Sequence, residues 1–124
     1  LIDLKFLSGS VDEVIANESY KKFYPHRTGH WLGLDVHDLG PYRTSDGNDF
    51  VKTIPGMIYT IEPGLYIPAD AQEAPPAFRG IGIRTEDDIL ITDTGFENLT
   101  KAIPKTISEI ENACTEDYRK FLIE

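Results

Sequence analysis

The chain has 124 residues, of which 40% are hydrophobic and 27% charged, a composition typical of one globular domain. Twenty-one acidic and twelve basic residues give a net charge of −9, which argues against nucleic acid or an anionic membrane as partner, because both attract lysine and arginine patches. No apolar run is long enough to span a membrane, and the single cysteine, Cys114, excludes an internal disulfide and favours a cytoplasmic location.

The first element is predicted to be helical. Residues 1–7 form an apolar opening without an initiating methionine, and we expect the chain to be a domain excised from a longer protein. Gly9 can end a first helix, and Ser10 can cap a second, with Glu13 completing a Ser-x-x-Glu capping box. The second helix is predicted over residues 11–24, where a proline stops it.

The middle of the chain predicts strands. Residues 26–38, which contain every histidine, have strand character, and residues 39–53 form a polar turn region. Residues 57–61 are rich in β-branched and aromatic side chains, which is typical of a strand. A Pro-Gly step breaks this strand, and residues 65–67 resume it.

The second half of the chain predicts a surface loop over 68–79, a long strand over 81–92 and a short antiparallel partner over 96–99. A last helix begins near Thr106 or Ser108 and should carry three side chains inward, namely Ile107, Ile110 and Cys114. This order predicts an α+β domain, a mostly antiparallel sheet with helices on one face, because a doubly wound parallel sheet would need helices between its strands.

The histidine run is the first candidate site. Imidazole is the commonest metal ligand, although a lone histidine in a strand is more often structural. On a regular strand, residues seven apart point to opposite faces, so His30 and His37 would diverge. If both serve one site, a bend must lie between them, and Gly33 is the expected position.

Two glutamates are candidate metal ligands. Glu62 precedes the Pro-Gly break and is either a solvated side chain or a ligand at a strand end. Glu86 shares a strand face with Arg84 and Asp88, so it belongs either to a solvated charge ladder or to a site. One histidine with two glutamates suits Mn, Zn, Co or Fe ions. Hydrolases with two such ions need about five or six protein ligands.

Three ordered motifs closely resemble those of Xaa-Pro aminopeptidases. They are residues 26–38 (HRTGHWLGLDVHD), 56–67 (GMIYTIEPGLYI) and 79–92 (RGIGIRTEDDILIT). Residues 93–100 also fit, so the likeness covers nearly the whole chain. The resemblance implies half of a pita-bread metallopeptidase fold. It also implies that residues 1–124 are the C-terminal portion of a catalytic domain, whose upstream half and N-terminal domain lie outside this sequence.

The resemblance further implies a dinuclear centre, usually of Mn²⁺ with Zn²⁺ or Co²⁺ as alternatives, that releases the N-terminal residue of peptides with proline in second position. His30 and Glu62 would ligate one ion and Glu86 would bridge both. Glu62 would also handle the proton of the nucleophilic water. The family's two further Asp ligands are not found here, so this piece alone is expected to be inactive, at most a weak metal binder, and prone to self-association.

The resemblance also assigns residues around the substrate. His37 would lie by the substrate carbonyl and the proline nitrogen, and His26 would help to line the proline pocket. Arg84 would orient neighbouring carboxylates. Arg84 and Tyr66 would both lie beside the metal ligands and the substrate. The full-length protein is expected to be a homo-oligomer.

Three alternatives stay open. Prolidase shares the ligand pattern, but the segment between its histidine motif and the strand at 57–61 is typically longer. A non-catalytic, protein-binding relative of the same fold would generally lose ligand residues, whereas this chain keeps them. The third alternative is a structural fragment with a solvated acidic face.

Overall fold

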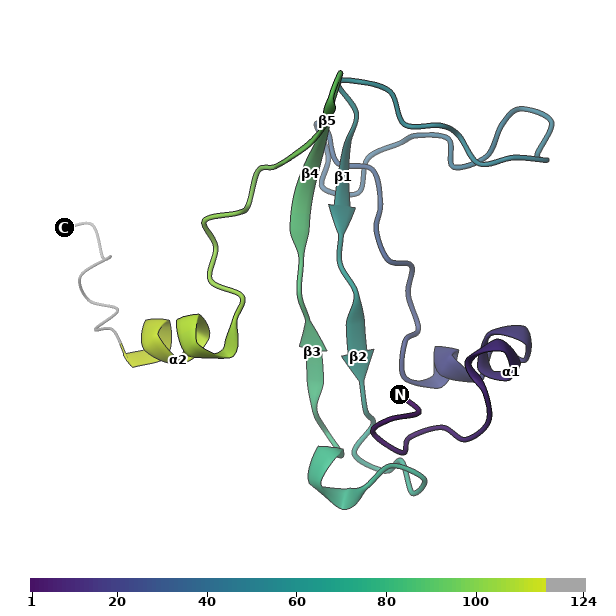
Figure 1. Cartoon of the computed structure of the whole chain (residues 1–124), viewed down its shortest axis with the longest axis vertical. Coiled ribbons are helices and arrows are strands. Elements are labelled where there is room, and N and C mark those ends of the chain that lie inside the picture. Colours follow the sequence, from purple (N-terminus) through teal and green to yellow (C-terminus); the bar gives the residue numbers. More distant parts are fainter. Residues whose placement is uncertain (116–124) are drawn as a thin grey trace.

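A computed structural model of the protein describes residues 1–115. Its helices and strands follow one another along the chain as shown in Figure 1. They are α1 (Val11–Ala16), the 3₁₀ turn η1 (Ser19–Lys22), β1 (Ile58–Ile61), β2 (Gly64–Tyr66), the 3₁₀ turn η2 (Pro76–Phe78), β3 (Gly82–Arg84), β4 (Asp87–Thr92), β5 (Gly95–Asn98) and α2 (Ile107–Thr115). No helix among the described residues is long and apolar enough to cross a membrane.

The central feature is a long antiparallel ribbon, with β1 and β2 on one side and β3 and β4 on the other (Figure 1). Ile58 of β1 pairs with Leu90 of β4, and Tyr66 of β2 pairs with Gly82 of β3. The two pairings have the same register. The same number of residues therefore separates the two ladders on each side of the ribbon. The ribbon is therefore one structural unit with a local break in its middle.

Two segments widen the upper part of this ribbon. β5 pairs antiparallel with β4 as a hairpin. On the other edge of β1, the Glu62 N–H donates to the Thr28 carbonyl at 2.6 Å and the Leu32 N–H donates to the Ile58 carbonyl at 3.1 Å. The order across the sheet is thus residues 28–32, β1, β4 and β5, all antiparallel.

The buried core lies at the β2–β3 end of the ribbon. Five side chains form it, namely Phe6, Phe23, Ile67, Ala71 and Ala74. The rings of Phe6 and Phe23 are 5.5 Å apart, and Phe6 meets Phe78 edge to face. Other large apolar side chains of the strands are exposed, for example Ile83 in β3 and Phe96 in β5.

Two predictions about the helices fail in part. The capping box of α1 is confirmed, but α1 ends at Ala16 instead of reaching residue 24. The Asn17 side chain accepts a hydrogen bond from the Ser19 N–H, and Glu18 has a left-handed backbone (φ 56°). Local side-chain bonding of this kind competes with helix continuation. The opening residues 1–7 form turns instead of a helix.

Other predictions need correction as well. The predicted surface loop 68–79 buries Ala71 and Ala74 in the core, because its backbone folds back over Phe6 and Phe23. The long strand 81–92 is interrupted between β3 and β4. α2 begins where expected, but Ile107, Ile110 and Cys114 are exposed, since no described element covers this face.

Candidate metal centre

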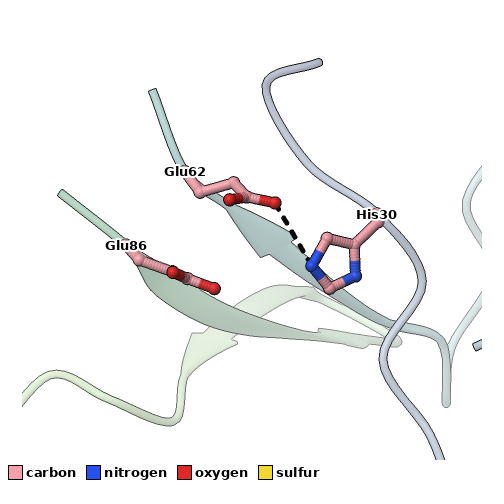
Figure 2. Close-up of side chains that lie close together, drawn as sticks. All are labelled: His30, Glu62 and Glu86. Carbon is pink, nitrogen blue, oxygen red and sulfur yellow. Dashed lines mark ion pairs between the residues drawn. The ribbon is translucent and has the colours of Figure 1, made fainter. Parts of the chain in front are cut away.

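The three predicted ligands meet at one place. His30, Glu62 and Glu86 each offer a ligand atom, and these atoms all lie within 4.8 Å of one another. Figure 2 shows the His30 ring pointing toward the Glu62 carboxylate, with Glu86 on the neighbouring strand. No other group of three His, Cys, Asp or Glu residues comes together in this way within residues 1–115.

The strand registers explain this convergence. Ile61 pairs with Asp87 and Gly64 pairs with Arg84, so Glu62 stands opposite Glu86 at the break of the ribbon. On the other edge of β1, the Thr60 N–H donates to the His30 carbonyl at 2.9 Å. Residues that face each other in antiparallel strands point to the same side of the sheet. The three ligands therefore share one face although they come from three separate segments.

The imidazole of His30 is oriented for metal binding. Its Nδ1 lies 2.8 Å from the Trp31 carbonyl, and its Nε2 lies 3.2 Å from Oε1 of Glu62. A carbonyl oxygen only accepts, so Nδ1 must carry a proton in this contact. With its proton on Nδ1, a metal-binding histidine presents the lone pair of Nε2, and here Nε2 is the nitrogen that faces the carboxylates.

Arg84 lies between the two carboxylates. Its Nε is 3.6 Å from Oε2 of Glu62 and 3.3 Å from Oε2 of Glu86. The pKa of Arg84 is raised above its ordinary value, first by hydrogen bonding to the Tyr66 side chain and then by the charge of Glu86. One arginine thus contacts both predicted carboxylate ligands, which is a suitable position for orienting them.

Tyr66 and His26 form a second group beside the ligands. Nε2 of His26 lies 2.9 Å from the Tyr66 hydroxyl, and the His26 ring centroid lies 5.4 Å from that of Tyr24 and 5.2 Å from that of Tyr66. Gly64 leaves room for Tyr66, because a Cβ there would stand 2.7 Å from its hydroxyl. The result is an aromatic wall next to the predicted metal ligands.

The bend predicted at Gly33 is confirmed. Residues 33–37 fold back, and the Asp38 N–H donates to the Trp31 carbonyl at 3.0 Å. As a result the ring centroids of His30 and His37 are 4.3 Å apart. Strand pairing of the histidine run is limited to residues 28–32. The predicted strand character is therefore correct for that half of the run and wrong for the other half.

Several of these groups, among them His30, Glu62 and Arg84, border an open cleft of about 360 Å³. Its lining consists of His26, Arg27, Gly29, His30, His37, Tyr42, Glu62 and Arg84. The three converging groups offer one imidazole nitrogen and two carboxylates. This donor set fits a divalent ion such as Mn²⁺, Zn²⁺ or Co²⁺ better than a soft ion that prefers thiolates.

One buried residue of this site was missed by the sequence-based reasoning. The Thr60 side chain contacts both His30 and Glu62 through hydrogen bonds. Side chains alternate between the two faces of a strand, so Thr60 is expected on the same face as Glu62. This alternation could have indicated that Thr60 lies near the site. A threonine in a strand is nevertheless ordinary by composition, so nothing in the sequence marked its hydroxyl as part of the site.

Comparison with known proteins places these residues in context. The family model described as metallopeptidase family M24 matches residues 2–93. The Xaa-Pro aminopeptidase of Escherichia coli K12 is 54% identical over 112 residues, which is 90% of this chain and 24% of that protein. Human Xaa-Pro aminopeptidase 3 is 41% identical over 86% of this chain and 20% of its own length.

Solved structures agree with the sequence relatives. Aminopeptidase PepP of Pseudomonas aeruginosa superposes with a TM-score of 0.85 at 52% identity, covering 90% of this chain and 25% of that one. Escherichia coli aminopeptidase P bound to the inhibitor Pro-Leu gives a TM-score of 0.79 over the same shares. The predicted fold class, α+β and part of a pita-bread fold, is confirmed. The chain spans about a quarter of the length of these relatives.

Proposed function

The chain belongs to metallopeptidase family M24, and on this basis we propose that the whole protein is a metal-dependent aminopeptidase that removes an N-terminal residue preceding proline. The observation that carries the proposal is the convergence of His30, Glu62 and Glu86 from three separate segments. The 54% sequence identity to an Xaa-Pro aminopeptidase, over 90% of this chain, supports peptides with proline in second position as the substrate class.

We further propose that the metal centre is dinuclear, with Mn²⁺ as the expected ion and Zn²⁺ or Co²⁺ as alternatives. His30 and Glu62 would hold one ion and Glu86 would bridge both. Two further Asp ligands would come from a part of the whole protein outside these 124 residues. The ions would lower the pKa of a bound water and offset charge that develops on the substrate oxygen.

The residues of this chain would bind and orient the peptide. The aromatic wall formed by His26 and Tyr66 suits the apolar ring of a proline residue. His37, held against His30, would donate a hydrogen bond near the scissile carbonyl and the proline nitrogen. Glu62 would accept the proton of the attacking water, while Arg84 keeps both carboxylates in place.

The separate behaviour of residues 1–124 is also a proposal. A C-terminal portion of a catalytic domain with three of about five or six ligands would be inactive alone and would bind metal weakly. Its exposed apolar sheet residues support self-association of the isolated piece. The single cysteine supports a cytoplasmic whole protein. We propose that this protein is a homo-oligomer.

The test uses the whole protein, its metal content and two substrates, an Xaa-Pro-Xaa tripeptide and an Xaa-Pro dipeptide. We expect Mn²⁺-dependent cleavage of the tripeptide before proline, and loss of both metal and activity in His30→Ala. Turnover of the dipeptide alone would indicate a prolidase instead. A protein that binds no metal and cleaves neither peptide would be a non-catalytic relative.

A further inference from the structure

Thr60 is a buried hydroxyl group beside the metal ligands. It lies in β1 with 2% of its surface exposed, in a segment otherwise made of isoleucine and tyrosine. A buried hydroxyl requires hydrogen-bond partners, because leaving it without them costs free energy. The partners of Thr60 therefore indicate what its side chain does.

Both partners belong to the proposed metal centre. The backbone N–H of His30 donates to Oγ1 of Thr60 at 3.0 Å. Oγ1 in turn lies 3.3 Å from Oε1 of Glu62. Since a carboxylate only accepts, the single proton of the Thr60 hydroxyl points toward Glu62. The hydroxyl thus links the backbone of one ligand to the carboxylate of another.

We propose that Thr60 is a positioning residue of the metal centre. Oε1, the oxygen that Thr60 contacts, is also the oxygen that lies 3.2 Å from Nε2 of His30. The other oxygen, Oε2, pairs within residues 1–115 with Arg84 at 3.6 Å, and the Arg84 side chain is half exposed. Thr60 therefore fixes the rotation of the Glu62 carboxylate, while the backbone bond sets how close the His30 segment lies to β1. This inference rests on the proposed function only in assuming that an ion binds here.

A purely structural role for Thr60 predicts a different result. Threonine and valine have nearly the same shape and both favour strands, so packing alone would survive Thr60→Val. Removing the hydroxyl leaves the His30 N–H and Glu62 Oε1 without this partner. Thr60→Ser keeps the hydroxyl and removes only a methyl group. The two variants therefore separate hydrogen bonding from packing.

The experiment measures Mn²⁺ affinity of the whole protein by calorimetry. Groups that orient metal ligands typically contribute about 10- to 100-fold to metal affinity or activity. We expect Thr60→Val to bind Mn²⁺ at least about 10-fold more weakly and Thr60→Ser to stay within about 3-fold of the wild type. The Co²⁺-loaded Thr60→Val protein should also show an altered visible absorption spectrum. Thr92→Val, on β4, is the matched control and should bind as the wild type does.

Two results would overturn the inference while leaving the proposed function intact. One is unchanged Mn²⁺ affinity and an unchanged Co²⁺ spectrum in Thr60→Val. The other is an equal loss of affinity in Thr60→Ser and Thr60→Val, which would assign the effect to packing. If the wild-type protein binds no ion that His30→Ala removes, the proposed function itself fails. Circular dichroism of each metal-free variant shows whether it is folded.

Discussion

Glu62 and Glu86 stand opposite each other across the antiparallel ribbon, at the step where its ladder is interrupted. Two carboxylates this close repel each other when both are ionised. Arg84 supplies one positive charge within 3.6 Å of Glu62 and 3.3 Å of Glu86. The pair therefore keeps an excess negative charge that a divalent cation would neutralise.

Glu86→Gln should separate metal binding from stability. Removing one of two facing charges should raise the free energy of unfolding of the metal-free whole protein by at most about 1 kcal/mol. Metal at a hundred times the wild-type Kd should stabilise the wild type by about 2.7 kcal/mol, and the same concentration should stabilise the variant less, because its Kd is higher. Thermal unfolding with and without Mn²⁺ measures both effects.

The control for this prediction is Glu97→Gln, which removes an exposed carboxylate from β5. It should leave the Mn²⁺-dependent increase in melting temperature as it is in the wild type. A Glu86→Gln protein that still gains the full increase would show that Glu86 is not a ligand.

Local features of the fold were predictable because neighbouring residues determine them. The capping box of α1 depends on Ser10 and Glu13 alone. The bend that begins at Gly33 is held by Asp38, whose carboxylate accepts the Leu34 N–H. The break before Gly64 follows from a proline that cannot donate to a ladder. Each of these rests on a few adjacent residues.

Long-range features were not predictable in the same way. The burial of Ala71 and Ala74 depends on their packing against Phe6 and Phe23, which are far away in the sequence. The residue pattern made His30, Glu62 and Glu86 candidate ligands, and the resemblance to a family favoured that interpretation over solvated side chains. Their common face, however, depends on two strand registers that no local pattern determines. The role of Thr60 depends on the same registers.

Gly29→Ala should displace His30. A Cβ at position 29 would stand 1.9 Å from the backbone carbonyl oxygen of Thr60, so residues 28–32 would have to move away from β1. Because His30 follows directly, its ring would leave the carboxylates. We expect Mn²⁺ affinity of the whole protein to fall at least about 10-fold, measured by calorimetry.

Gly47→Ala is the control for this effect. Gly47 has a φ of +75° and open space around its Cβ position, in a turn away from the ligands. An alanine there should cost about 1–2 kcal/mol of stability through backbone strain and leave the metal affinity unchanged. If Gly29→Ala and Gly47→Ala lose Mn²⁺ affinity equally, the effect at Gly29 comes from general destabilisation.

His37 should matter for turnover and not for metal content. Its ring lies 4.3 Å from that of His30 at a tilt of 48°, but it is not among the three converging ligands. His37→Ala in the whole protein should keep its Mn²⁺ and lose at least about 100-fold in kcat, because the proposed hydrogen-bond donor to the reacting carbonyl is removed. Metal analysis with steady-state kinetics on an Xaa-Pro-Xaa peptide provides the measurement.

Gly33→Ala should reproduce part of this phenotype. A Cβ at Gly33 would stand 2.1 Å from Oδ2 of Asp38, which accepts the Leu34 N–H and holds the bend. The bend would open and His37 would move, while His30 stays paired with β1. Loss of metal from either variant would assign His37 to the metal centre itself.

Glu109 fixes the start of α2. Its Oε2 accepts hydrogen bonds from the Thr106 N–H at 2.9 Å and from the Lys105 N–H at 3.2 Å, and the Thr106 hydroxyl donates to the same oxygen at 2.8 Å. These bonds, first among them that from the Thr106 backbone, lower the pKa of Glu109. The ionised carboxylate is therefore the form that caps the helix.

The stability of α2 should depend on pH through this carboxylate. The pKa of Glu109 is lower in the folded than in the unfolded state. Its stabilising effect is therefore fully present above the pKa of the unfolded state, about 4.3, and disappears as the pH falls through the pKa of the folded state. Hydrogen exchange of amides 107–115 in the whole protein, corrected for the intrinsic rate, should lose protection over that range. Glu109→Gln lacks the titrating group, so its protection should already be reduced at pH 7 and should stay constant on acidification. An acid-induced loss of equal size in the variant would assign the effect to another group.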